Sequence, residues 1–317
     1  MDNDKLFERL QKANPKIDLK IGDDNVFEYE RISFGVPKLD KLVGGGIPKK
    51  RFSMLLGQTN VGKSFLASQL VANVQKDGGS AVWIDTEQSF DPIWNEKNGV
   101  DTSKIIVLQP ANGEEGLNLT SSALQEGVDI VVIDSFAGLV PAAVQDEEFG
   151  YNPMAWQARF LNSALPKLLT HLKHGSALVA INQLRSNVGR VTYNNMPGGI
   201  GQQFYSHLQL EIRRSGWIEG ENKKKIGFDM EIRLKKTKQG GDDWDSITLP
   251  YKVGGGIDQI EVTINEALEK DLITKGGSWY VYKGKRIHGK NNVRQYFVDN
   301  PDMLEELTKG VSNDLLS

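Results

Sequence analysis

The sequence predicts an α/β fold in which a mostly parallel sheet lies between helices. Short runs rich in Val, Ile and Leu recur along the chain and are separated by helix-like stretches, which is the pattern of α/β domains. These runs lack a strict alternation of apolar and polar residues, as expected for parallel strands that are buried on both faces. A Gly-punctuated loop follows the run that begins at Phe52, and such loops in α/β folds bind phosphate groups.

Five buried parallel strands are expected, followed by two strands of a different kind. The runs at 207–213 and 228–234 do alternate, so we expect antiparallel strands that close one side of the sheet. Helix-forming stretches, such as 64–76, lie between the apolar runs. The buried strands are predicted at 52–56, 81–85, 105–109, 129–134 and 177–182.

The chain divides into three predicted parts. Residues 1–30 are polar and weakly patterned, and residues 31–258 carry the strand–loop–helix repetition of the core. After the three glycines at 254–256 the pattern changes to short helices and one hairpin-like run. A small α+β C-terminal domain is therefore predicted over 259–317.

Composition excludes several classes of function. The chain has 317 residues, a net charge of -3 and no cysteine, so disulfides, Cys-ligated zinc and thiol catalysis are excluded. No apolar run approaches the roughly 18 residues that span a membrane, and the N-terminus lacks the apolar segment of a signal peptide. A cytoplasmic protein without a membrane partner is expected. The slight negative charge gives no argument for nucleic acid, so that argument needs local basic patches.

The stretch Gly57-x-x-x-x-Gly62-Lys63-Ser64 fits the Walker A pattern of nucleotide-binding proteins. Glycines are needed because the loop turns tightly and its backbone approaches the phosphates closely. Successive N–H groups and the N-terminus of the following helix would face the anion. Lys63 would reach the β- and γ-phosphates of ATP, and the Ser64 hydroxyl would bind Mg²⁺.

Carboxylates after two other apolar runs supply further parts of an ATPase site. Asp134 ends the run at 129–134, where a Walker B motif places the carboxylate that holds Mg²⁺. Asp85 and Glu87 lie at the end of the run at 81–85, and one of them would polarise the attacking water. Periodicity does not choose between Asp85 and Glu87.

Six segments occur in an order that is specific to one family. They are ISFGVPKLDKLVGGGIP, GQTNVGKS, WIDTEQSFDPIWNEKNGVD, VVIDSFAGLVP, INQLR and GGIGQQFY. Together they resemble the RecA family of bacterial-type homologous-recombination ATPases over residues 31–315. The resemblance implies a RecA-like P-loop NTPase core and a DNA-dependent ATPase that uses ATP and Mg²⁺. It also implies a helical filament that forms on single-stranded DNA and pairs it with homologous duplex DNA. A hexameric helicase or motor on the same core is the alternative, and closed rings would distinguish it.

The resemblance implies roles for residues around the nucleotide. Glu87 would be the general base that orients water, Asp134 would be the Walker B carboxylate, and Gln183 would sense the γ-phosphate. Asp91 and Trp94 would border the adenine. The phosphate loop would contribute Gly57, Gln58, Thr59, Asn60, Val61, Gly62, Lys63, Ser64 and Phe65.

The family forms helical filaments, so the resemblance implies a homo-oligomer whose head-to-tail interface does not close into a ring. Lys236 and Lys238 would reach across this interface to the neighbour's ATP, where two cations do what an arginine finger does. Phe204 would be an interface aromatic, and residues 1–30 would dock on the adjacent subunit. Departures from the family pattern beside Phe204 and in residues 1–30 favour a phage or mobile-element version. The sequence does not indicate a loading or mediator protein.

Two segments, 144–156 and 185–201, leave the predicted carboxyl edge of the sheet without a helix or strand pattern. In the RecA family two such loops line the filament axis and hold single-stranded DNA. Cations and bare backbone N–H groups suit phosphates, and a tyrosine suits base stacking. The resemblance places an apolar wedge between base triplets at Met154 and Val188. The expected DNA contacts are Met154, Arg159, Arg185, Ser186, Asn187, Val188, Gly189, Arg190, Tyr193, Gly198 and Gly199.

A second basic zone is expected to bind the incoming duplex weakly. Arg213, Arg214 and Arg233 match family positions with this role, whereas Glu231 stands where the family has a cation. The C-terminal domain adds a run of cations that would capture duplex DNA with an affinity that falls with salt, unless the run is only a solvated surface. This run comprises Lys275, Lys283, Lys285, Arg286, Lys290 and Arg294.

Overall fold

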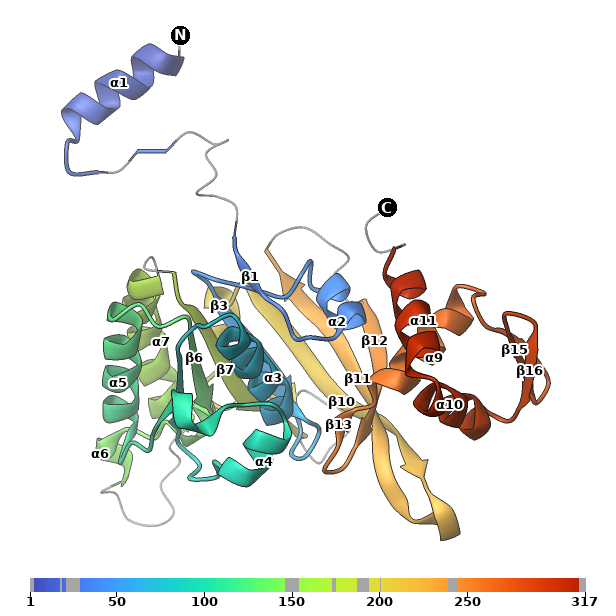
Figure 1. Cartoon of the computed structure of the whole chain (residues 1–317). Helices are drawn as coiled ribbons and strands as arrows, with labels where there is room; N and C mark the ends of the chain where they lie inside the picture. Colours follow the sequence, from blue (N-terminus) through green and yellow to red (C-terminus); the bar gives the residue numbers. More distant parts are fainter. Residues whose placement is uncertain are drawn as a thin grey trace. The chain divides into compact units, whose positions relative to one another are not determined.

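A mostly parallel sheet forms the centre of residues 31–317 in this computed structural model (Figure 1). Its strands, in the order in which they lie side by side, are β13 (Gly256–Ile257), β12 (Ser246–Lys252), β11 (Lys225–Thr237), β10 (Leu208–Glu219), β3 (Phe52–Gly57), β7 (Ala177–Gln183), β6 (Ile130–Asp134), β4 (Ala81–Asp85) and β5 (Ile105–Leu108). The strands from β10 to β5 run parallel, and β11, β12 and β13 continue the sheet in antiparallel pairs. The predicted α/β class is confirmed.

The structure describes residues 3–17, 19–20, 29–145, 154–172, 175–186, 194–199, 201–238 and 245–313. Residues 1–30 and residues 31–317 are separate units. In the first unit, helix α1 (Asn3–Ala13) leaves the side chains of Leu6 and Leu10 exposed. The second unit begins with β1 (Arg31–Ile32), α2 (Pro37–Leu42) and β2 (Ile47–Pro48).

Helices cover both faces of the sheet, as its buried apolar strands require (Figure 1). Consecutive strand residues point to opposite faces, so Leu55 and Leu56 belong to different apolar clusters. The Leu55 cluster includes α3 (Lys63–Lys76), whereas the Leu56 cluster includes α5 (Gly113–Gln125) and α7 (Met154–His171). Two layers of apolar packing therefore hold the sheet from which the site residues project.

The prediction for the run at 207–213 is wrong in one respect. β10 is antiparallel to β11, but it is parallel to β3, with Leu208 opposite Ser53. The alternating pattern misleads because the polar residues of this strand are buried with partners. Glu211 is 2% exposed and accepts hydrogen bonds and ion pairs from Arg213 and Lys235. The other predicted strands are confirmed, with ends that shift by one or a few residues.

Parts of the two segments predicted to lack regular structure are helical or paired. In the first segment, α6 (Ala142–Gln145) precedes residues 146–153, which lie outside the described residues, and α7 already begins at Met154. In the second segment, β8 (Arg185–Ser186) pairs with β9 (Asn194–Asn195), and α8 begins at Gly201 and ends at Tyr205. The structure therefore corrects the prediction for the second segment, because two short strands pair at its base.

The end of the chain has a small apolar core of its own, with Ile264, Tyr280 and Phe297 buried in it. Its elements are α9 (Gln259–Glu269), β14 (Thr274–Gly276), β15 (Trp279–Tyr282), β16 (Lys285–His288), α10 (Lys290–Asp299) and α11 (Pro301–Asn313). In the part of the chain that the structure describes, no helix combines the length and the apolarity that a bilayer crossing requires.

Asp258 joins this end of the chain to the main sheet. Its side chain caps α9 by accepting from the Glu261 backbone N–H, and it forms ion pairs of 2.6 Å with Lys252 and 3.0 Å with Arg294. Lys252 ends β12 and Arg294 lies on α10. One nearly buried carboxylate therefore ties together two helices and an outer strand of the sheet.

We expect Asp258→Ala to lower the free energy of unfolding by about 1–3 kcal/mol, because it removes a helix cap and leaves two cations without their shared partner. Chemical denaturation followed by circular dichroism measures the change. Glu305→Ala is the control, since Glu305 forms only an exposed pair with Lys309 within α11 and should leave the stability unchanged. Equal effects of the two substitutions would contradict the role of Asp258.

Candidate nucleotide site and DNA-binding surfaces

The register of the parallel strands brings the predicted nucleotide residues to one edge of the sheet. Gly57, at the end of β3, lies opposite Gln183 at the end of β7 and opposite Ile212 of β10. Asp85, at the end of β4, lies opposite Asp134 at the end of β6. Ligands of open α/β sheets bind at this carboxyl edge.

The phosphate loop depends on two glycines. A Cβ atom at Gly57 would lie 2.3 Å from the backbone oxygen of Ile212, so only glycine lets the strand leave the sheet here. Gly62 has a φ of 95° and caps α3, and a Cβ atom there would lie 2.3 Å from Cε of Met230. Because no side chain caps this end of α3, its first backbone N–H groups face the loop as an anion site requires.

Lys63, Ser64 and Asp134 meet at the base of this loop. Lys63 is 7% exposed and its Nζ donates to the Gln58 backbone oxygen at 2.6 Å, while the Ser64 hydroxyl donates to Asp134 Oδ2 at 2.8 Å. Burial lowers the pKa of Lys63, an effect that Asp134 and Glu87 oppose. Burial raises the pKa of Asp134, which is 6% exposed, to about 6, although the Ser64 hydrogen bond and Lys63 lower it. A hydroxyl and a carboxylate this close offer the oxygen ligands that Mg²⁺ prefers.

The contacts of Asp85 and Glu87 separate the two carboxylates that the sequence pattern leaves open. Asp85 is fully buried and accepts from the backbone N–H groups of Ser89 and Phe90 and from Gln109 Nε2. Two of these contacts hold the loop after β4, and the third joins Asp85 to the end of β5 (Ile105–Leu108). Glu87 instead accepts from the Ser135 hydroxyl at 2.5 Å and from Gln183 Nε2 at 3.0 Å. Glu87 is therefore the carboxylate that is available to a reacting group.

A pocket of about 490 Å³ opens beside the phosphate loop. Asp91 caps α4 (Pro92–Lys97), where it accepts from the N–H groups of Ile93 and Trp94, and it lines a second pocket of about 270 Å³ that shares Ser64 and Trp94 with the first. The first pocket joins polar loop residues to a wall of aromatic side chains, which suits a ligand with a charged end and a flat apolar end. It is lined by Asn60, Gly62, Lys63, Ser64, Phe65, Trp94, Arg214, Trp217, Phe228, Tyr251 and Val253.

Three of the residues predicted at a subunit interface lie together at the opposite edge of the sheet. Lys236 Nζ donates to the Gln203 backbone oxygen, and Lys238 Nζ donates to the Phe204 backbone oxygen at 3.1 Å. The Phe204 side chain is 70% exposed. Lys236 pairs with Gln209 of β10, next to Leu208, which lies opposite Ser53 at the start of β3. Each residue of a strand advances about 3.3 Å, so these lysines lie far from the phosphate loop at the end of β3.

Two buried amides that the sequence reasoning missed hold the second predicted DNA segment in place. Asn182 precedes Gln183 on β7, and its Nδ2 donates to Pro197 O at 3.0 Å and to Gln202 Oε1 at 2.9 Å. Gln202 Nε2 in turn donates to Pro197 O at 2.6 Å and to Gly199 O at 3.2 Å. Asn182 is detectable in the sequence as a polar residue that follows the apolar run at 177–181, whereas Gln202, between Gly201 and Gln203, gives no such signal.

The structure places only some of the predicted single-stranded DNA contacts. Arg159 is exposed on α7, and Gly198 and Gly199 have φ angles of 79° and 75° that favour glycine. Met154 is the first residue of α7, and Arg185 and Ser186 form β8. The contacts predicted at Asn187, Val188, Gly189, Arg190 and Tyr193 lie outside the described residues.

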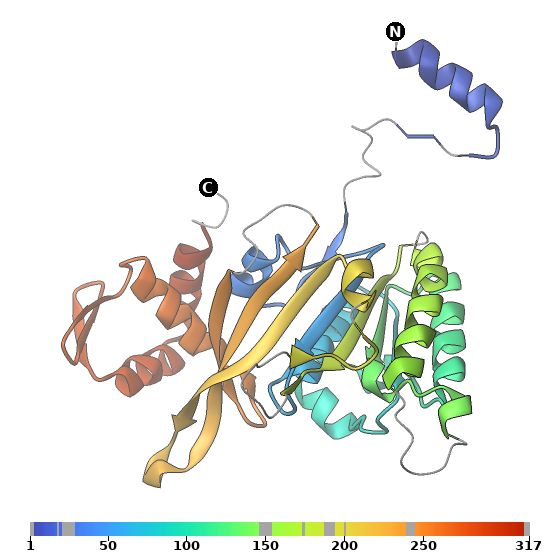
Figure 2. The ribbon, with the colours of Figure 1, turned by 180° about the vertical axis from the view of Figure 1, so that it is seen from behind.

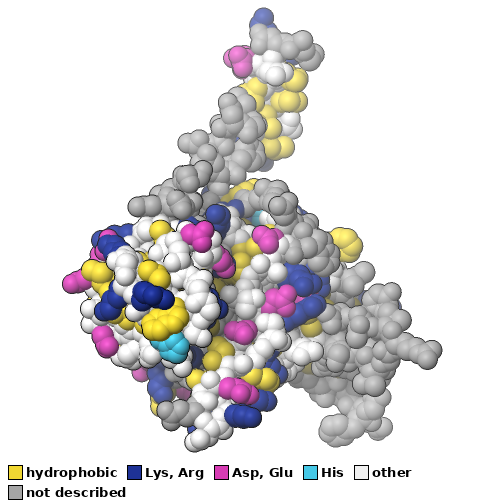
Figure 3. Space-filling model, turned by 90° about the vertical axis from the view of Figure 1, so that its right-hand side faces the viewer, with side chains coloured by type: hydrophobic (Ala, Val, Ile, Leu, Met, Phe, Trp, Pro, Cys, Tyr) yellow, Lys and Arg dark blue, Asp and Glu magenta, His cyan; other side chains and the backbone are white. Residues whose placement is uncertain are grey.

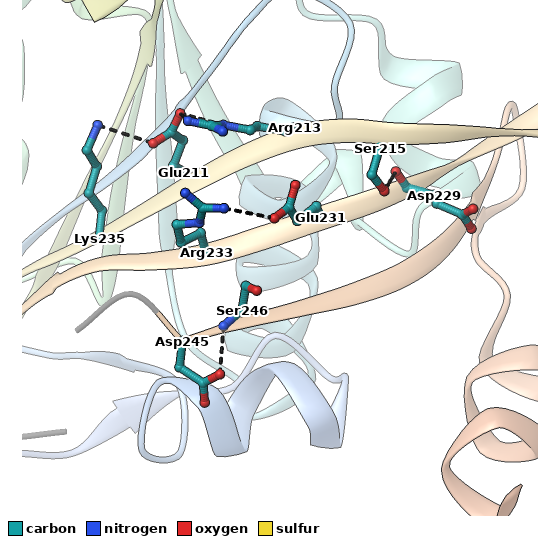
Figure 4. A network of polar contacts seen from close by, with 9 residues as sticks. All are labelled: Glu211, Arg213, Ser215, Asp229, Glu231, Arg233, Lys235, Asp245 and Ser246. Atoms are coloured by element: carbon teal, nitrogen blue, oxygen red, sulfur yellow. Dashed lines mark hydrogen bonds and ion pairs between the residues drawn. The ribbon is translucent and has the colours of Figure 1, made fainter. Parts of the chain in front are cut away.

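The three arginines predicted to bind duplex DNA do not lie on one surface. Arg213 is opposite Glu231 on the ladder of β10 and β11 and forms an ion pair of 2.6 Å with Glu211, and Arg233 pairs with Glu231 at 3.2 Å (Figure 4). Arg214 is instead opposite Met230, which contacts the phosphate loop, and it lines the nucleotide pocket. Strand alternation therefore separates Arg214 from the other two.

The cationic run of the C-terminal domain is partly neutralised by acids that lie far away in the chain. Lys283 pairs with Glu306, Lys290 with Glu261 and Arg294 with Asp258.

The other cations of this run lie against aromatic rings. Figure 3 shows Lys and Arg side chains beside hydrophobic ones on this face of the molecule. The distances to the ring centroids are 4.1 Å for Lys285 and Tyr296, 5.2 Å for Arg286 and Trp279, and 5.7 Å for Lys275 and Tyr280.

Comparison with known proteins decides the family. The RecA N-terminal domain matches residues 6–252, and the RecA C-terminal domain matches residues 262–316. The chain belongs to the RecA family. Protein RecA of Acinetobacter baumannii strain ATCC 17978 is 33% identical over 305 residues, which cover 94% of this chain and 87% of the relative. Protein RecA of Enterococcus faecalis is 36% identical over 305 residues, with 92% and 85% covered, and that of Cytophaga hutchinsonii is 36% identical over 296 residues, with 91% and 83% covered.

These findings do not favour the alternative of a hexameric helicase or motor. Both RecA domains are matched, and the similarity extends along nearly the whole chain rather than over the ATPase core alone. The predicted RecA resemblance is therefore confirmed. The roles of individual site residues stay predictions.

The raised pKa of Asp134 predicts how stability depends on pH in this RecA-family protein without metal. The folded carboxyl binds its proton more tightly than the unfolded one, whose pKa is 3.8, so the folded state loses stability as the pH rises from about 4 to about 6. We expect Asp134→Asn to remove this loss. Across that interval the free energy of unfolding of the variant should therefore rise by up to about 3 kcal/mol relative to that of the wild type. Denaturant unfolding in EDTA at several pH values measures it, and parallel pH profiles would contradict it.

Proposed function

We propose that the chain is an ATP-dependent DNA recombinase that forms a helical filament on single-stranded DNA and exchanges strands with homologous duplex DNA. Membership of the RecA family and the nucleotide site at the carboxyl edge of the sheet support the proposal. The division into residues 1–30, 31–258 and 259–317 and a cytoplasmic location belong to the same proposal.

The hydrogen bond between Gln183 and Glu87 is the observation that supports coupling between ATP binding and DNA binding. Gln183 ends β7, and the segment predicted to bind single-stranded DNA begins two residues later with β8. Its Nε2 donates to Glu87 at 3.0 Å, on the side of the sheet edge where Lys63 and Asp134 meet. A γ-phosphate that engages Gln183 would shift this contact and with it the base of the DNA segment. The nucleotide state thereby orders or releases the DNA site.

Each residue of the site has a specific task in this proposal. Lys63 and the loop N–H groups bind the phosphates, and Ser64 and Asp134 hold Mg²⁺. The metal, when bound, neutralises charge that develops on the phosphate oxygens. Glu87 accepts from the Ser135 hydroxyl, so one carboxylate oxygen is already positioned while the other can orient water.

Lys236 and Lys238 complete the site of a neighbouring protomer rather than their own. Both lie at the amino edge of the sheet beside the exposed Phe204, whereas the phosphate loop lies at the carboxyl edge. A head-to-tail contact brings the amino edge of one protomer to the carboxyl edge of the next. Two cations at the γ-phosphate would then stabilise the charge of the transition state, so hydrolysis depends on assembly.

DNA would contact two regions of each protomer. The segments around 146–153 and 187–193 bind single-stranded DNA, together with Arg159 of α7. Arg213, Arg233 and the cations that lie over aromatic rings in the C-terminal domain bind duplex DNA weakly. Lys283, Lys290 and Arg294 form pairs with acids, as Arg213 and Arg233 also do, so this second surface offers the duplex less positive charge than its number of cations suggests.

We expect Lys63→Ala to abolish both ATP hydrolysis and ATP-dependent binding of single-stranded DNA, because the ammonium group that binds the phosphates is lost. Phosphate release and fluorescence anisotropy of a labelled oligonucleotide measure the two activities. Lys76→Ala is the matched control, since Lys76 ends the same helix and lies far from the loop. Wild-type protein whose hydrolysis is not stimulated by single-stranded DNA would contradict the proposed function.

Glu87→Gln should separate filament formation from turnover. The amide keeps the size of the side chain and can still contact Gln183, but it cannot act as a base, so we expect hydrolysis to fall by at least about 100-fold. Filaments on single-stranded DNA should still form with ATP and persist longer, as seen by electron microscopy. A variant that hydrolyses ATP at the normal rate would refute this role of Glu87.

A further inference from the structure

The hairpin of β10 and β11 carries an aromatic side chain to the nucleotide pocket by means of a β-bulge. Figure 2 shows this hairpin extending past the rest of the sheet. On the ladder Arg214 lies opposite Met230 and Trp217 lies opposite Phe228, with a register shift between Arg214 and Gly216. Residues three apart on a regular strand point to opposite faces, but one extra residue in a bulge turns them to the same face. Arg214 and Trp217 therefore share the face that looks on to the phosphate loop.

A row of aromatic rings connects Trp217 to the helix of the phosphate loop. Phe65 of α3 contacts Tyr251 with 5.1 Å between ring centroids, Tyr251 contacts Phe228 at 4.8 Å, and Phe228 contacts Trp217 at 6.5 Å. Phe65, Tyr251 and Phe228 are nearly buried, whereas Trp217 is 45% exposed at the end of the row. All four line the pocket that also contains Lys63 and Ser64.

Two cations hold the exposed ring in position. The Arg214 guanidinium lies 4.1 Å from the centroid of the Trp217 ring, and Lys225 Nζ lies 4.2 Å from it. Cation–π contacts of this kind restrict where a ring can turn. A large apolar surface that is fixed, half exposed and adjacent to a phosphate loop is suited to the nucleoside part of a nucleotide.

We propose that Trp217 is a further wall of the nucleotide site that contacts the base or ribose of the bound nucleotide, and that Arg214 is a positioning residue that holds the Trp217 ring. The inference rests on the proposed nucleotide site and adds a residue that the motifs do not contain. In this proposal Arg214 acts at the nucleotide pocket. Of these two neighbouring arginines, only Arg213, on the opposite face of β10, would contact DNA.

Equilibrium binding of ADP and of inorganic tripolyphosphate to the full-length protein, without DNA, tests the inference. Trp217→Ala should weaken ADP binding by about tenfold, as the loss of one aromatic contact to a base does. It should leave tripolyphosphate binding unchanged, because that probe has no nucleoside. Trp217→Phe should keep most of the affinity for ADP.

A double-mutant cycle tests the positioning role of Arg214. Arg214→Ala should weaken ADP binding when Trp217 is present and have no further effect in the Trp217→Ala background. Ile218→Ala is the matched control for Trp217→Ala and should leave ADP binding unchanged, because Ile218 is next to Trp217 and points to the other face of the hairpin. Additive losses would overturn the positioning role. Unfolding curves of each variant show whether the hairpin still folds.

The outcomes separate failure of this inference from failure of the proposed function. Wild-type protein that binds neither probe would remove the nucleotide site itself. If Lys63→Ala binds neither ADP nor tripolyphosphate while Trp217→Ala binds ADP normally, only the role of Trp217 would be overturned. Equal weakening of ADP and tripolyphosphate would show a structural effect and overturn it too. A Trp217→Ala variant that loses DNA binding while keeping ADP affinity would assign the ring to DNA instead.

Discussion

The register of β3 between β7 and β10 is the constraint on which the rest of the structure depends. It places Gly57 beside Gln183 and Ile212, with no room for a side chain on the glycine. The chain consequently leaves the sheet at one level in three places. These are the phosphate loop after β3, the connection from β7 to a predicted DNA segment, and the projecting hairpin of β10 and β11. A shift by one residue would turn the side chains of a strand to the opposite face, so Gln183 could no longer contact Glu87.

The same edge carries charge that is costly to bury. Lys63 and Asp134 are almost fully enclosed, and burial opposes the charged form of both. Their proximity to each other and to Ser64 offsets part of this cost. Sites that bind anions and metals commonly keep such charges because the ligand, when it binds, replaces the lost hydration. The two apolar clusters on either side of the sheet supply the stability that this arrangement requires.

The sequence predicts most of the fold and the phosphate loop, because the pattern of each strand and of the loop lies in one short stretch of the chain. Buried strands are visible as apolar runs, and the phosphate loop is one continuous motif. The choice between Asp85 and Glu87 needed the fold, since it depends on Gln109 and Gln183 from other strands. The orientation of Arg214 was also hidden, because a bulge in one strand is not apparent in the residue pattern. The acids that neutralise part of the C-terminal cationic run come from other helices.

In the proposed function, nucleotide binding at one edge of the sheet controls whether a filament forms on DNA. Electron microscopy of the purified protein with single-stranded DNA, with and without a non-hydrolysable ATP analogue, tests this claim most directly. Extended helical filaments with DNA along the axis should form only when the analogue is present. Closed rings, or equal binding of DNA in the absence of nucleotide, would contradict this proposal.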